Sequence, residues 1–144
     1  MRLYWDANTF IRMVEATDLV ASRLNDLLEP GVALRLRTVT SELTLAEVLV
    51  EPLRAGDQLR IDAYETLLTR HDAIEILPVS RGILRSAAHI RARHGGTKLP
   101  DAIHVACAEL AGCDVLLSAD RRLPVRAGLR VLAPSLSSLD TLFE

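Results

Sequence analysis

The stretch LYWDANTF (residues 3–10) joins a strand-like segment to a helix-like segment through an aspartate. Three bulky residues that favour strands precede Asp6, and an apolar helical pattern begins soon after it. Aspartate is rare within strands and common in turns, so Asp6 suits the end of a strand. Asp6 is therefore either a plain turn residue or the first member of a site at the edge of a sheet, and its partners decide which.

Short apolar strands and helical segments alternate along the whole chain. Strands are predicted at residues 2–5, 33–39, 75–79, 114–118 and 129–133. Helices are predicted over residues 7–14, 17–29, 40–54, 57–72, 80–94 and 100–112, with a short closing helix at the end of the chain. This alternation predicts one α/β domain over residues 1–144, with helices covering both faces of a mostly parallel sheet. Ligand sites in such sheets lie beyond the carboxyl ends of the strands.

The composition is that of an ordinary globular protein. The net charge of −2 excludes a global basic field for nucleic acid, although a local basic patch remains open. No apolar run is long enough to span a membrane. The two cysteines, Cys107 and Cys113, form neither a metal-binding nor a disulfide pattern. We therefore expect a cytoplasmic protein.

Two acids occupy the ends of predicted elements, as Asp6 does. Asp120 follows the strand-like DVLLS, and Asp101 opens the apolar segment DAIHVACAEL directly after a proline. Each has a plain structural interpretation, because Asp is common in turns and in the first turn of a helix. Because the Asp101 helix is strongly apolar, it should cross the core and begin next to the sheet. Both acids are therefore candidates for the same edge as Asp6.

Glu47 is the most informative acid. In LTLAEVLV (residues 43–50) only Thr44 and Glu47 are not apolar, so a helix here has almost no solvated face. A buried glutamate costs several kcal/mol unless it is paired, protonated or bound to a cation. The alternative is that Glu47 reaches solvent at the edge of its helix.

If these four acids converge, their repulsion is strong, and divalent cations would relieve it. An all-oxygen site suits Mg²⁺ or Mn²⁺ rather than zinc. Such an ion activates water and stabilises the charge that develops on phosphate, so phosphodiester hydrolysis is the chemistry that the set would serve. His104 lies three residues after Asp101 on the same helix face, and we interpret it as a packed or hydrogen-bonded core histidine.

The chain resembles the PIN-domain family, in particular the VapC-type toxin ribonucleases of bacterial toxin–antitoxin pairs. The resemblance rests on three segments in this order, LYWDANTFI, SELTLAEVL and KLPDAIHVACAELAGCDVLLSADRRL. It implies a PIN-like three-layer fold with a mostly parallel central sheet flanked by helices. The family's four acids match Asp6, Glu47, Asp101 and Asp120.

Smaller features of the resemblance concern the neighbours of these acids. Asn8 matches the family's polar residue two positions after the first Asp, and Ser118 matches the small hydroxyl before the last. Two positions depart from the pattern: Thr9 stands where an aliphatic residue is common, and Leu123 where Phe is frequent. Neither departure replaces one of the four acids.

The resemblance implies an endoribonuclease that depends on Mg²⁺ or Mn²⁺, forms a homodimer and is inhibited by a cognate antitoxin. Because the chain is not basic overall, contacts with RNA must be local. Besides Asn8 and Ser118, the candidates are Arg121 and Arg122, which follow Asp120, and Lys98, which precedes Asp101. The helix predicted within residues 17–30 carries an apolar face that packs on the sheet, on a second copy or on an antitoxin.

Two other functions remain open. A phosphatase of the haloacid dehalogenase type also begins with an Asp after its first strand, but it needs a second carboxylate or hydroxyl where Asn8 stands. A non-catalytic PIN-like module that binds RNA or protein would keep the fold without needing a buried Glu47.

Overall fold

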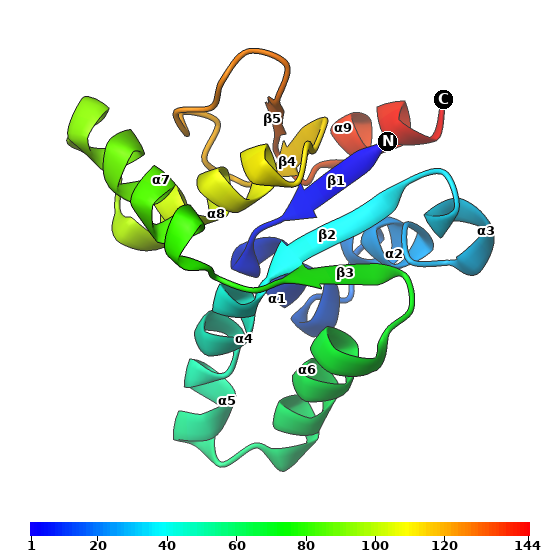
Figure 1. Cartoon of the computed structure of the whole chain (residues 1–144). Coiled ribbons are helices and arrows are strands. Elements are labelled where there is room, and N and C mark those ends of the chain that lie inside the picture. Colours follow the sequence, from blue (N-terminus) through cyan, green and yellow to red (C-terminus); the bar gives the residue numbers. More distant parts are fainter.

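The computed structural model describes residues 1–69 and 71–144 in full, and Arg70 only by its place in a helix. The chain forms one five-stranded parallel sheet in the order β3-β2-β1-β4-β5 (Figure 1). The strands are β1 (Arg2–Trp5), β2 (Arg37–Ser41), β3 (Ile74–Leu77), β4 (Val115–Leu117) and β5 (Arg130–Leu132). The helices are α1 (Ala7–Glu15), α2 (Leu19–Asp26), α3 (Pro30–Ala33), α4 (Glu42–Val48), α5 (Val50–Ala55), α6 (Gln58–Arg70), α7 (Arg81–Arg93), α8 (Leu99–Leu110) and α9 (Leu136–Phe143).

The central strand β1 divides the core into two layers. Leu3 and Trp5 pack with residues of α1, α2, α6 and α9 in one buried cluster. Tyr4 points to the opposite face and packs with residues of α7 and α8 in a second cluster. This division follows from the alternation of side chains along a strand. The three-layer α/β arrangement expected from the sequence is confirmed (Figure 1).

Most predicted elements are present within a few residues, with two corrections. The strand predicted at 33–39 is wrong at its start, because Pro30 begins the short helix α3 and the strand runs only over Arg37–Ser41. The single helix predicted over 40–54 is instead two helices, α4 and α5, that meet at Leu49. The short closing helix is confirmed as α9.

The amphipathic helix predicted within residues 17–30 packs mainly inward. Leu24, Leu27 and Leu28 are buried in the core, whereas Leu19 is 70% exposed. The face therefore serves mostly to attach α2 to the rest of the fold. Among the described residues, no helix combines the length and apolar character needed to cross a membrane.

Candidate active site

The strand order reverses between β1 and β4. The chain builds outward from β1 through β2 to β3, then returns to the other side of β1 to form β4 and β5. Ligands in open α/β sheets bind where the order reverses in this way, beyond the carboxyl ends of the strands. Asp6 directly follows β1, and its backbone N–H donates to the Leu117 carbonyl at the end of β4 over 3.3 Å. Asp120 follows β4 three residues later.

Asp6 is held by the helix that it starts. Its Oδ1 accepts hydrogen bonds from the backbone N–H of Thr9 at 2.9 Å and from the Thr9 hydroxyl at 2.8 Å, so Asp6 is the N-cap of α1. The Thr9 hydroxyl also lies 3.0 Å from the Leu117 carbonyl, and its single proton serves one acceptor at a time. The Asp6 side chain is nearly buried, with 9% of the residue exposed. The structure thus gives a function to Thr9, one of the two departures from the family pattern.

Two hydroxyl groups, one just before α4 and one within it, link this helix to the sheet. The Thr40 hydroxyl, near the end of β2, donates to the Trp5 carbonyl at 2.9 Å. Thr44, in the first turns of α4, lies 2.8 Å from the same hydroxyl. These bonds link α4 to the end of β1 and bring its inner face, which carries Glu47, over the sheet edge.

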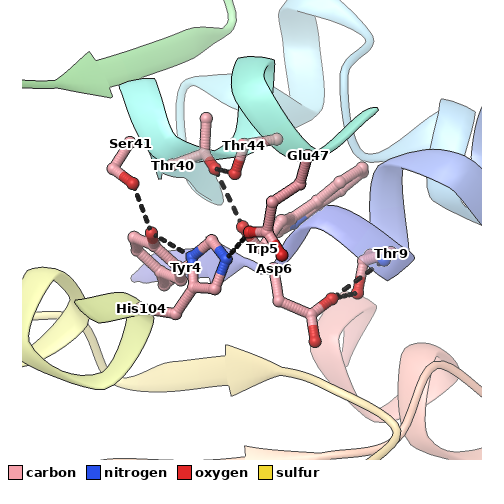
Figure 2. Close-up of polar contacts among 9 residues, drawn as sticks. All are labelled: Tyr4, Trp5, Asp6, Thr9, Thr40, Ser41, Thr44, Glu47 and His104. Carbon is pink, nitrogen blue, oxygen red and sulfur yellow. Dashed lines mark hydrogen bonds and ion pairs between the residues drawn. The ribbon is translucent and has the colours of Figure 1, made fainter. Parts of the chain in front are cut away.

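Glu47 joins a hydrogen-bonded series of side chains that crosses the core (Figure 2). Its Oε1 lies 2.5 Å from Nε2 of His104, on α8. Nδ1 of His104 lies 2.8 Å from the Tyr4 hydroxyl, which also lies 3.0 Å from Ser41 Oγ, and the single Tyr4 proton serves one of these two partners at a time. Tyr4 and His104 are buried, whereas the Glu47 side chain is 33% exposed. Burial, with a smaller contribution from Cys107, raises the pKa of Tyr4 well above its usual range, so its hydroxyl stays protonated.

His104 is a hydrogen-bonded core residue, as the sequence predicted, but sequence reasoning missed its link to Glu47. Its spacing of three residues places it on the same face of α8 as Asp101, but this spacing does not identify Glu47 as its partner. The structure shows that this face also meets α4.

Asp101 lies in the first turn of α8, and its surroundings connect all four acids. Burial is the main cause that raises the pKa of its carboxyl, and the neighbouring His104 acts in the opposite direction. The charges of Asp120, Glu47 and Asp6 then each raise the same pKa further. The structure therefore places the other three predicted acids within electrostatic reach of Asp101.

Asp120 is the most open of the four acids, with its side chain 46% exposed. Its backbone N–H donates to Ser118 Oγ at 3.2 Å, and its Oδ1 accepts from the backbone N–H of Arg122 at 3.0 Å. The Arg122 guanidinium lies 3.6 Å from the same Oδ1. Ser118 is only 4% exposed, and this position favours a supporting role under Asp120 over direct contact with RNA.

A polar cavity of about 380 Å³ opens beside Asp101 and Asp120. Its other walls come from the loop between α7 and α8 and from the loop after β4, and include His94 and Arg122. Of the remaining RNA candidates, Arg121 and Lys98 are exposed but do not line this cavity, and Asn8 lines a separate one with Thr9 and Arg12. A larger cavity of about 580 Å³ lies at the opposite edge of the sheet, near Arg37 and Ala73. Its size is not evidence of function here, because it lies away from the acids.

The donor set suits a hard cation, although the carboxylates do not yet surround one point. Among the described residues, no three His, Cys, Asp or Glu side chains are arranged to hold an ion together. Asp6, Glu47 and Asp120 each engage one carboxylate oxygen with a protein group, and within the described residues the second oxygen of each accepts no hydrogen bond. Mg²⁺ is usually held by one or two carboxylates and several waters, so three direct ligands are not required.

A family model described as the PIN domain matches residues 3–129. The chain belongs to the PIN domain family. This PIN domain is 22% identical to a chain of a toxin–antitoxin complex from Klebsiella pneumoniae, with a TM-score of 0.67 over 92% of this chain and 98% of that one. It is 13% identical to a chain of VapBC2 from Rickettsia felis bound to a DNA fragment from its promoter. The TM-score is 0.69, over 92% of this chain and 98% of that one.

A third similar structure is VapC20 from Mycobacterium tuberculosis, described as a toxin that cleaves the sarcin–ricin loop. It is 15% identical, with a TM-score of 0.68 over 84% of this PIN domain and 92% of that chain. These identities establish a shared fold. Among curated proteins, none matches the sequence significantly. Membership of the PIN family leaves the haloacid dehalogenase alternative without support.

Proposed function

We propose that this PIN domain is a metal-dependent endoribonuclease and the toxin of a type II toxin–antitoxin pair. The observation that supports the proposal is that Asp120, Glu47 and Asp6 lie within electrostatic reach of Asp101, beside the switch point of the sheet, where each of them raises the pKa of Asp101. A non-catalytic module has no need for this repulsion. A stability cost concentrated at a cleft is typical of catalytic sites.

The four acids would share the binding of Mg²⁺ or Mn²⁺. When bound, such an ion makes water more acidic and stabilises negative charge on the phosphate and on the leaving oxygen. Asp101 and Asp120 line the polar cavity and would meet the ion from its open side. Asp6 and Glu47 would present their second carboxylate oxygens from the buried side, because their first oxygens are held by Thr9 and His104.

The RNA strand would lie along the cavity beside Asp101 and Asp120. Arg122 offers a guanidinium at its rim, and Arg121 and Lys98 are exposed nearby in sequence. These few cations would provide the local positive charge that a chain with a net charge of −2 lacks overall. Asn8, beside α1, would contact RNA further along the edge.

The proposed partners are a cognate antitoxin and a second copy of the chain. Support for the antitoxin comes from the similar structures, of which one is a toxin–antitoxin complex and another is VapBC2 bound to DNA, whereas the second copy is expected from the family resemblance. A cationic side chain of the antitoxin, placed among the four acids, would compete with the metal and inhibit cleavage without a change of fold.

The nuclease proposal is tested with purified protein and a mixed pool of RNA. Cleavage should require Mg²⁺ or Mn²⁺, stop with EDTA and disappear in Asp101→Asn. The matched control is Asp62→Asn on the exposed face of α6, which should cleave like the wild type. Cleavage that persists in Asp101→Asn, or that is absent with both metals, would reject the nuclease.

The toxin proposal has its own test. Expression of the chain should arrest bacterial growth, and the product of a short neighbouring reading frame should bind the protein and restore growth. Normal growth during expression of a protein that cleaves RNA would reject the toxin and leave the nuclease standing.

A further inference from the structure

The four side chains Glu47, His104, Tyr4 and Ser41 form a hydrogen-bonded series. It connects Glu47, a candidate metal ligand, to the interior, and each member comes from a different element. Glu47 comes from α4, His104 from α8, Tyr4 from β1 and Ser41 from the end of β2 (Figure 2). The sequence separations are 57 residues between Glu47 and His104 and 100 between His104 and Tyr4. The series therefore exists only in the folded chain.

The chemistry of the groups fixes the direction of the bond to Glu47. A carboxylate oxygen can only accept, so Nε2 of His104 is the donor to an ionised Glu47. With Nε2 as the donor, the other ring nitrogen, Nδ1, can accept the single proton of the Tyr4 hydroxyl, and this bond holds the ring in its orientation. Because Tyr4 and His104 are buried, water does not replace either partner.

We propose that His104 and Tyr4 are positioning residues, which fix the Glu47 carboxylate through Oε1 and would leave Oε2 available to a metal ion. This inference rests on the proposed nuclease function. A glutamate side chain on a helix has several rotatable bonds, and at 33% exposure Glu47 would otherwise sample many of them. A histidine that donates to a carboxylate removes this freedom and sets the angle at which the carboxylate meets an ion.

A purely structural function explains these contacts less well. The Glu47 side chain is partly exposed and could be solvated by water, so folding does not require a buried partner for it. The histidine nevertheless presents a nitrogen to Glu47 at 2.5 Å and not an apolar surface. A buried polar side chain, His104, thus orients the Glu47 carboxylate beyond the carboxyl ends of the strands.

The test compares three variants of the positioning pair. His104→Leu removes the donor, His104→Gln places an amide nitrogen near the position of Nε2, and Tyr4→Phe removes only the hydroxyl. Loss of a residue that orients a metal ligand costs about 10–100-fold in activity or metal affinity. We expect His104→Leu to lower kcat by about 100-fold with little change in KM, and Tyr4→Phe by about 10-fold, in line with that range. His104→Gln should recover most of the loss, and His89→Leu on the exposed face of α7 is the matched control.

Mn²⁺ binding to the protein without RNA gives a readout that does not depend on cleavage. Calorimetry should show about 10-fold weaker binding in His104→Leu, as expected for a lost orienting partner. The same substitution in a Glu47→Gln background should have no further effect, because the orienting bond no longer has a carboxylate to place. An equal loss in both backgrounds, or a loss confined to KM, would overturn the proposal.

The outcomes separate the positioning role from the nuclease function. If the wild type cleaves no RNA but Mn²⁺ binding couples His104 to Glu47, the nuclease is rejected and the positioning role stands. If the wild type cleaves RNA and His104→Leu behaves like His89→Leu, the positioning role is rejected. Should His104→Leu fail to fold, Tyr4→Phe and His104→Gln decide by the same criteria.

Discussion

The two halves of the candidate site are built in opposite ways. Asp6 and Glu47 belong to what we call the buried half, in which one oxygen of each carboxylate is fixed by a buried donor, Thr9 or His104. Asp101 and Asp120 belong to an open half that lines the polar cavity. In the open half, among the described residues, Asp101 receives no side-chain hydrogen bond, and Asp120 is bonded only within its own loop.

The difference indicates where the protein provides order and where it relies on a ligand. Hydrogen bonds to Asp6 and Glu47 set their positions before any ion arrives, which is preorganisation in the usual sense. Ionised Asp101 is instead repelled by the negative charges of its neighbours. A cation bound there would therefore be stabilised most by relieving this repulsion. Substitutions in the two halves should therefore have different effects on stability, even where both remove activity.

The largest expected effect is the loss of cleavage in Asp101→Asn. Removing one group that stabilises the transition state of a catalytic site typically costs about 100–1,000-fold in rate, and we expect a loss of at least that size. The metal-free variant should nevertheless melt at an equal or higher temperature, because it no longer carries a carboxylate whose charged form is disfavoured by burial and by three acids. Initial rates with Mg²⁺ and thermal melts in EDTA measure both. A clear fall in melting temperature would mean that Asp101 is structural.

The stability gain of Asp101→Asn should also depend on pH. The pKa of Asp101 is raised in the fold above its ordinary value of 3.8, so the folded protein binds this proton more tightly than the unfolded chain. The free energy of unfolding of the wild type therefore falls as the pH rises from the ordinary value through the raised one. The difference in the free energy of unfolding between Asp101→Asn and the wild type should reach its full size at neutral pH. It should vanish below about pH 3, where residue 101 of the wild type is protonated in both the folded and the unfolded state. Urea titrations in EDTA at several pH values measure it, and a gain that grows as the pH falls would contradict the assigned cause.

The buried half should behave differently when its carboxylate is removed. Asp6→Ala deletes the N-cap of α1 and should lower the free energy of unfolding by about 1 kcal/mol, the usual cost of such a loss. Asp6→Asn keeps an oxygen that accepts from Thr9, so its stability should stay near that of the wild type while cleavage is lost. Urea unfolding of the two variants compares them directly. If both are equally stable, the cap contributes nothing and the distinction between the halves is wrong.

These contrasts also show how much of the fold and of the candidate site could be predicted from the sequence. The succession of strands and helices along the chain followed from local patterns, and each acid was found because it interrupted or opened an apolar segment or ended a strand. The short helix α3 and the break at Leu49 were missed, since Pro30 and the apolar run at residues 43–50 allowed more than one local structure. Where local patterns are ambiguous, tertiary packing decides.

The partners of the acids were harder to predict than the acids. The contact of Thr9 with Asp6 follows from the rule that an N-cap accepts from the third residue after it, so it was within reach of the sequence. The contact of His104 with Glu47 spans 57 residues and depends on how α4 meets α8, which no local pattern encodes. The buried half of the site is thus the part that only the folded structure reveals.

The smallest expected effect concerns the rim of the open half. Arg122 lines the cavity with its side chain 93% exposed, and it lies 3.6 Å from Asp120. Arg122→Glu should weaken RNA binding several-fold and reduce the slope of log affinity against log salt by about 0.7, the value for one lost phosphate contact on a single strand. The effect on kcat should be slight, because the substitution leaves the four acids in place.

The matched control is Arg54→Glu on α5, where the wild-type side chain is 71% exposed, because it makes the same change of charge on another element. Binding measured at several salt concentrations with the inactive Asp101→Asn protein as background separates affinity from cleavage. An unchanged slope for Arg122→Glu, or an equal change for Arg54→Glu, would mean that RNA does not follow the cavity beside Asp101 and Asp120.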